Sequence, residues 1–152
     1  MTGTREFLRK YLRAKKERMV LENHILALKD TLDLQGVSYD GVKVQTSKEK
    51  GSGIEEKIAS KVNLDQQIID MRNVELNCLE SVQELINEIN DDHEGNLKLV
   101  LSEKYIKGGS WRTIAERINF SKSWTERLHQ KALKEAEKVL EKRKKIVKNS
   151  IK

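Results

Sequence analysis

Apolar residues recur at alternating spacings of four and three between positions 7 and 32, and this repeat restricts the possible folds more than any other feature. A period of about 3.5 residues places such side chains along one side of a long helix that packs against another helix. Arg18 is the one polar member, and a charged side chain at such a position snorkels towards water or fixes the helix register. Gly36 follows, where a helix C-terminus is expected. The repeat consists of Phe7, Tyr11, Ala14, Arg18, Leu21, Ile25, Leu28 and Leu32.

A second repeat predicts another long helix, from near Ile54 to about Asn90. Residues 37–53 lie between the repeats and contain glycines and short polar side chains, so we interpret them as a loop with a potential small hairpin. Two long helices joined by a reversing loop predict an antiparallel, coiled-coil-like helical hairpin. Such a hairpin buries only a narrow stripe, which favours a homodimer formed through it. The second repeat consists of Leu64, Ile68, Met71, Glu75, Cys78, Val82, Leu85 and Ile89.

The composition favours helices over sheets. Proline is absent, aromatic residues make up 5% of the chain and charged residues 36%, whereas strands need β-branched and aromatic faces. We predict an all-α fold with a long helical hairpin at residues 1–92, a C-terminal domain at residues 93–148 and a tail at residues 149–152. No apolar run approaches the roughly 18 residues that a membrane span needs, and we see no secretion signal. We therefore expect a soluble intracellular protein that does not bind membranes.

Few residues have the types and spacing that catalysis or metal binding requires. Asp91, Asp92, His93 and Glu94 can each bind a metal ion, but four adjacent side chains cannot all converge on one ion. We interpret this segment as a helix end or hinge. Cys78 is the only cysteine, which excludes an intramolecular disulfide, and its apolar stripe predicts a buried, inert thiol. Without a phosphate-binding loop or a nucleophile with its base, we expect no catalytic activity, no metal and no cofactor.

Positive charge is concentrated towards the C-terminus. Residues 93–152 hold 16 Lys and Arg against 7 Asp and Glu, a balance of +9. Residues 1–92 hold 14 against 17, a balance of −3. Polyanion binding, if present, therefore belongs to the C-terminal part of the chain. The alternative is a basic tail that only aids solubility.

Residues 111–130 match a helix-turn-helix pattern and follow a short helix predicted at 96–107. The pattern needs a small residue where the second helix crosses, which is Ala115, and a turn residue that tolerates a left-handed backbone, which is Asn119. Thr125 is the weakest member, because it is half polar where valine is usual. The apolar positions of the pattern are occupied by Ile114, Ile118, Phe120, Thr125 and Leu128.

The second helix of this pattern presents side chains that can read bases. Arg and Lys donate to guanine, Gln pairs with adenine, Glu accepts from cytosine, and Ser suits either. The outward positions are Lys122, Ser123, Glu126, Arg127 and Gln130. Contacts to DNA phosphates are expected from Arg112, Thr113, Lys131 and the N-cap residues Ser110 and Ser121, which begin the two helices. The alternative is a solvated charged face.

Residues 97–140 resemble region 4 of bacterial sigma factors, the C-terminal domain that binds the −35 promoter element. The resemblance is carried by Tyr-Ile-x-Gly at 105–108, Ser-Trp-x-x-Ile-Ala at 110–115, Ser-x-Ser-Trp at 121–124 and Lys-Ala-Leu at 131–133. With its long helical N-terminal part, the chain resembles a family of small proteins from phages and prophages of Gram-positive bacteria. These proteins are grouped with the ArpU and RinA late-gene transcriptional regulators.

The resemblance implies a transcriptional regulator that acts on promoter DNA in the bacterial cytoplasm. By position, Lys122, Ser123, Trp124 and Arg127 fall where region 4 contacts bases, which adds Trp124 to the base-reading set. Nothing resembles region 2, which melts the −10 element, so we favour an activator that contacts host RNA polymerase over a complete sigma factor. One alternative is a DNA-packaging protein such as a small terminase subunit. Another is a helical protein-interaction module with a basic tail.

Overall fold

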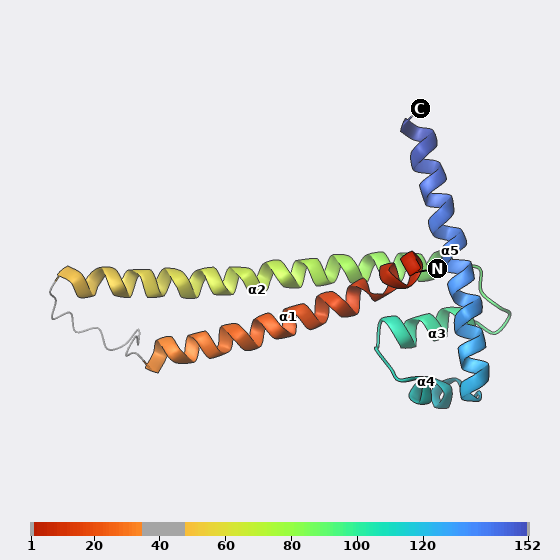
Figure 1. Cartoon of the computed structure of the whole chain (residues 1–152), viewed down its shortest axis with the longest axis horizontal. Coiled ribbons are helices and arrows are strands. Elements are labelled where there is room, and N and C mark those ends of the chain that lie inside the picture. Colours follow the sequence, from red (N-terminus) through yellow and green to blue (C-terminus); the bar gives the residue numbers. More distant parts are fainter. Residues whose placement is uncertain (1, 35–47, 152) are drawn as a thin grey trace. The chain divides into compact units, whose positions relative to one another are not determined.

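The fold is all-α, as predicted. The computed structural model describes residues 2–34 and 48–151, and every regular element in these residues is a helix (Figure 1). In chain order the helices are α1 (Thr2–Leu34), α2 (Lys48–Glu88), α3 (Asn96–Tyr105), α4 (Trp111–Ile118) and α5 (Lys122–Ile151). None of the described helices is both long and apolar enough to cross a membrane.

Two of the expected boundaries are wrong. A loop was expected at 37–53, but α2 begins at Lys48, so residues 48–53 are helical; residues 37–47 lie outside the described part. Extending an existing helix is easier than nucleating one, which accounts for its passage through Gly51 and Gly53. The separate tail expected at 149–152 is also wrong, since α5 continues to Ile151. No proline or glycine follows Gly109 to end that helix.

The chain divides into two compact units, which differ from the expected division at residue 92. One unit comprises residues 15–75, and the other combines residues 1–14 with residues 76–152. The second unit includes the start of α1 and the end of α2 because their apolar side chains share one core with α3, α4 and α5. Its buried members include Leu8, Val82, Leu85, Ile86, Ile89, Leu97, Val100, Leu101, Ile114 and Leu133. Leu8 lies beside the predicted stripe rather than on it, and Cys78 is half-buried rather than buried.

In the unit of residues 15–75, α1 and α2 run antiparallel, because Arg18 pairs with Glu75 while Lys29 pairs with Asp65. Arg18 and Glu75 are the polar members of the two apolar repeats, so the polar residue of one repeat pairs with the polar residue of the other. Glu22 Oε2 accepts a hydrogen bond from Arg18 Nη1 at 2.7 Å, and Glu22 Oε1 accepts another from Arg72 Nη2 at 3.0 Å. The pKa of Glu22 is lowered, mainly by the hydrogen bond from Arg72 and then by that from Arg18.

This unit leaves much apolar surface in contact with solvent. Ile25 is buried, but Leu28, which belongs to the same repeat, is exposed. Burial is therefore confined to a narrow stripe, and the outer faces of α1 and α2 hold large apolar side chains. The exposed ones are Met19, Val20, Leu26, Leu28, Val62, Ile69 and Val74.

The segment between α2 and α3 is a helix boundary, as predicted for Asp91–Glu94. The Oδ1 atom of Asp91 accepts hydrogen bonds from the backbone N–H groups of Asp92 at 2.8 Å and Leu97 at 2.9 Å. Asp92 Oδ1 accepts from the backbone of Asn96 at 2.7 Å. Both carboxylates therefore satisfy N–H groups at the start of α3, where the helix dipole also favours negative charge.

We expect the Arg18–Glu75 pair to stabilise the fold more than the Lys29–Asp65 pair on the same helices. The side chains of the first pair are 18% and 15% exposed, whereas those of the second are 31% and 56% exposed. Water screens exposed pairs, so alanine double-mutant cycles should give a coupling of about 1 kcal/mol for the first and within ~0.5 kcal/mol of zero for the second. Urea unfolding followed by far-UV circular dichroism measures both. Equal couplings would contradict a special role for Arg18–Glu75 in setting the register.

Candidate nucleic-acid interface

α4 and α5 are joined by a three-residue turn whose local signals match the sequence pattern. The hydroxyl oxygen of Ser110 accepts from the backbone N–H of Thr113 at 3.2 Å, which caps α4. Ser121 does the same for α5 by accepting from the backbone N–H of Trp124 at 3.1 Å. Between them, Asn119 has a φ of 60° and a ψ of 40°, the left-handed conformation that was predicted for it.

Thr125 is fully buried despite its hydroxyl group. The hydroxyl donates a 2.8 Å hydrogen bond to the backbone carbonyl of Ser121, so no polar atom is left unsatisfied. The threonine methyl group can then fill the place where valine is usual. Ala115 is also buried, and its carbonyl accepts the backbone N–H of Phe120 at 3.1 Å, which closes the turn against α4.

One face of α5 is buried and the opposite face is open. The buried side chains repeat at helical spacing and consist of Thr125, Leu128, His129, Ala132, Leu133 and Ala136. The opposite side chains line a shallow hollow and consist of Ser123, Glu126, Arg127, Gln130, Lys131 and Lys134. Five of these six are residues that the sequence predicted to contact DNA. Lys134 was missed, although it continues the same face one turn beyond Gln130 and Lys131.

All of the predicted base-reading residues are exposed: Lys122, Ser123, Trp124, Glu126, Arg127 and Gln130. All of the predicted phosphate-contacting residues are exposed as well: Ser110, Arg112, Thr113, Ser121 and Lys131. Trp124 is 46% exposed, and its ring lies 6.3 Å from that of Phe120, centroid to centroid. Arg112 is engaged at the surface by Glu116, one turn along α4, at 3.5 Å. The face is therefore accessible, with most of its cations free to meet a ligand.

A buried carboxylate ties α3 to α4 beneath this surface. Glu103 is 4% exposed and accepts from Lys107 Nζ at 2.8 Å and from Arg117 Nη1 at 2.7 Å. Burial raises the pKa of the Glu103 carboxyl, but the hydrogen bonds and the positive charges of Lys107 and Arg117 together outweigh burial and hold the pKa below its ordinary value. Arg117 comes from α4 and Glu103 from α3, so the charge pair fixes the position of α4.

A second pocket beside the α5 face was not predicted. Its lining combines Arg5 and Arg9 from α1, Lys104 from α3, and Glu126 and Gln130 from α5. Nothing in the local sequence brings residues 5 and 104 together, because only the shared core places the start of α1 beside α3 and α5. The predicted face is therefore extended by cations from the N-terminus.

His129 also lines this pocket. It is 5% exposed, its Nε2 lies 2.7 Å from the hydroxyl oxygen of Tyr105, and its ring meets that of Trp111 edge-on at 4.6 Å between centroids. Burial lowers the pKa of His129 to about 4, and the neighbouring Arg5, Lys104 and Arg9 contribute to the shift. The imidazole is thus neutral at pH 7. Trp111 itself is half-buried and packs against the core, as predicted.

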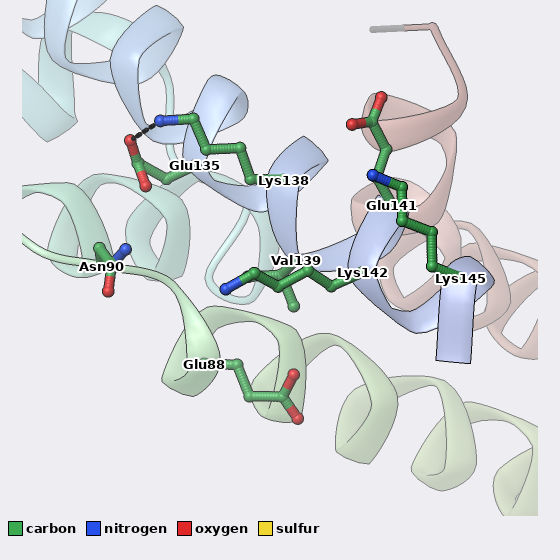
Figure 2. Close-up of a pocket in the computed structure, with 8 residues that line it drawn as sticks. All are labelled: Glu88, Asn90, Glu135, Lys138, Val139, Glu141, Lys142 and Lys145. Atoms are coloured by element: carbon green, nitrogen blue, oxygen red, sulfur yellow. Dashed lines mark hydrogen bonds and ion pairs between the residues drawn. The ribbon is translucent and has the colours of Figure 1, made fainter. Parts of the chain in front are cut away.

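Farther along α5, the lysines stand among carboxylates rather than forming a uniform basic surface. Figure 2 shows Lys138, Lys142 and Lys145 in a hollow that also holds Glu135, Glu141 and Glu88. Lys138 pairs with Glu135 at 2.9 Å, and the nearby Arg143 pairs with Glu88 at 2.9 Å. Two of the cations that make the C-terminus basic, Lys138 and Arg143, are therefore paired, while residues 141–148 still hold five Lys and Arg against one Glu.

We expect acid to destabilise the unit that holds His129. In the unfolded chain the histidine has its ordinary pKa of 6.5 and binds a proton below that pH. In the folded protein His129 has a pKa of about 4 and stays neutral until the pH approaches that value. The stabilisation is therefore complete above pH 6.5 and is lost as the pH falls towards 4, by about 3 kcal/mol. Urea unfolding followed by tryptophan fluorescence reports on this unit, since Trp111 and Trp124 both belong to it.

The glutamine variant His129→Gln keeps an uncharged acceptor for Tyr105 and should lose less stability than the wild type between pH 7 and pH 4.5. The matched control is His24→Gln, which replaces an exposed histidine and should retain the wild-type pH dependence. Identical pH profiles for all three proteins would show that protonation of His129 has no part in acid unfolding.

In residues 2–34 and 48–151, no group of three or more His, Cys, Asp or Glu side chains could hold a metal ion. The protein matches no known family model, and neither a curated protein nor a solved structure is found to match it.

Proposed function

We propose that α4, the turn at 119–121 and α5 form a DNA-binding helix-turn-helix, with α5 entering the major groove. The division of α5 into two faces carries the proposal. Its buried side anchors the helix to α3 and α4, so the opposite side can project without rearrangement. That side bears Lys122, Arg127 and Gln130, which suit guanine and adenine edges, beside Lys131 and Lys134, which suit phosphates.

The local geometry supports this assignment over a merely solvated face. Asn119 adopts the left-handed turn conformation, Ala115 is buried, and both helices begin with a serine cap. The distal part of α5 is also basic, but two of its cations, Lys138 and Arg143, are held in ion pairs with Glu135 and Glu88. The cations of the face, Lys122, Arg127, Lys131 and Lys134, form no ion pair with another described residue and can therefore meet a ligand.

The resemblance to sigma-factor region 4 and to ArpU- and RinA-like regulators supports a more specific role. We propose a phage or prophage transcriptional regulator that binds promoter DNA and activates transcription by contacting host RNA polymerase. We favour an accessory activator because the resemblance to sigma factors does not extend to region 2, which melts the −10 element. A DNA-packaging role remains the principal alternative, and the number of subunits discriminates between them.

We further propose that the unit of residues 15–75 mediates homodimer formation. Among the described residues, its outer faces carry seven large exposed apolar side chains, including Val20, Leu26 and Val62 at 68%, 61% and 62% exposure. A second copy of the same unit would cover such a surface, as helical hairpins commonly do in bundles.

We expect Arg127→Ala to weaken specific DNA binding by about 1–3 kcal/mol and to relax preference at one base pair, since a bidentate contact to guanine is lost. Repeated selection from random-sequence duplexes supplies the preferred site, and fluorescence anisotropy at several salt concentrations gives the affinity. Lys131→Ala should instead weaken every duplex alike and reduce the salt dependence by about one ion.

The matched control is Lys144→Ala, an exposed position on the same helix but away from the face. It removes the same charge and should leave sequence preference intact. Equal losses in Arg127→Ala and Lys144→Ala would show that bulk charge, rather than this face, binds DNA. Failure of the wild-type chain to retard any duplex at low salt would favour the protein-interaction module.

Light scattering after size exclusion should give twice the 17.6 kDa chain mass. Leu26→Lys, which places a charge on the proposed interface, should shift the protein towards the monomer. Ile146→Lys is the control, because Ile146 is 67% exposed on α5 and lies outside the unit of residues 15–75. A wild-type monomer would contradict the dimer, and a ring of eight or more subunits would favour DNA packaging.

A further inference from the structure

Three cations from distant parts of the sequence meet beside the α5 face. Arg5 and Arg9 come from the first turns of α1, and Lys104 comes from α3. They line one pocket with Glu126 and Gln130, which also line the hollow on the α5 face. The pocket and the hollow are therefore adjacent parts of one surface.

The cations of this pocket are poorly satisfied by the protein. Within the described residues, no carboxylate forms an ion pair with Arg5, Arg9 or Lys104. The Nε atom of Arg5 is buried and has no hydrogen-bond partner. Lys104 Nζ lies 4.6 Å above the centroid of the Trp111 ring, a contact that holds the ammonium group without neutralising it.

The surroundings favour an anion. Three positive charges face one carboxylate, that of Glu126, so the pocket carries a net charge of about +2 when His129 is neutral. Burial is the main cause of the depressed pKa of His129, and the positive charges of Arg5, Lys104 and Arg9 lower it further. A group with several acceptor oxygens can meet two guanidinium groups and an ammonium group at once.

We infer that Arg5, Arg9 and Lys104 form a phosphate-binding pocket that holds a backbone phosphate of the duplex contacted by α5. This inference rests on the proposed function. A helix in the major groove is flanked by phosphates of both strands, and Glu126 and Gln130 join the base-reading hollow to the pocket. The start of α1 thus becomes part of the DNA interface, about a hundred residues before the helix that reads bases.

Binding of duplex DNA across a salt series tests the inference with matched variants. Arg9→Ala removes an exposed pocket cation, while Arg13→Ala removes an exposed cation one turn farther along α1 that does not line the pocket. Arg9→Ala should lower the slope of log affinity against log salt by about one, so that affinity falls about threefold less between about 50 and 200 mM salt. Arg13→Ala should keep the wild-type slope, and neither variant should change sequence preference. Equal slopes for Arg9→Ala and Arg13→Ala would overturn the pocket.

Inorganic phosphate provides an arm that does not depend on DNA. Bound phosphate should raise the pKa of His129 in the wild type and in Arg13→Ala but not in Arg9→Ala. NMR of the imidazole signals measures this pKa. Lys104→Gln, which keeps the length of the side chain, should reduce the same response. If no duplex binds but phosphate shifts His129, the regulator function fails while the anion pocket stands. If duplexes bind and neither the salt slope nor His129 responds as described, the pocket fails while the α5 face stands.

Discussion

The close packing of α5 against α3 and α4 is the constraint on which the rest of the C-terminal unit depends. Ala132 and Ala136 are fully buried and Ala115 is nearly so, and such small side chains let the helices approach closely. Because a helix repeats every 3.6 residues, burying one line of α5 forces the residues two positions on to face outward. The chemical character of that outward line is therefore free of packing demands. The residues on this outward line can therefore serve to bind a ligand at little cost in stability.

Charged side chains have two different roles in this protein. In residues 15–75, Arg18 and Glu75 lie in apolar stripes and form an ion pair, so neither charge is available to a ligand. The same is true of Glu103, which Lys107 and Arg117 hold beneath the α5 face. The cations around Arg127, by contrast, have few carboxylate partners. Counting charges along a sequence cannot separate these cases, which is why the basic C-terminus looked more uniform than its α5 surface is.

Features set by local interactions could be predicted from the sequence. The bounds of α4, the serine caps and the left-handed Asn119 all depend on residues within one turn, where side-chain chemistry and backbone sterics decide. The exposure of Lys122 and Arg127 followed from helical phase. Helix ends without a strong stop were predicted less well, as at Lys48 and Ile151, because charged residues there continue a helix as readily as they end it.

Features set by tertiary packing could not be predicted. Arg18 was recognised as an interruption and Glu75 stood in the other repeat, but only the antiparallel register shows that they pair. The same limit hid the group formed by Arg5, Arg9, Lys104 and His129, which lie on three helices and become neighbours only when one core is buried. A prediction of the DNA interface confined to residues 110–131 therefore misses cations whose position depends on the far end of the chain. If the start of α1 contacts a phosphate, a contiguous helix-turn-helix fragment would retain the base-reading residues yet bind less tightly than the complete unit.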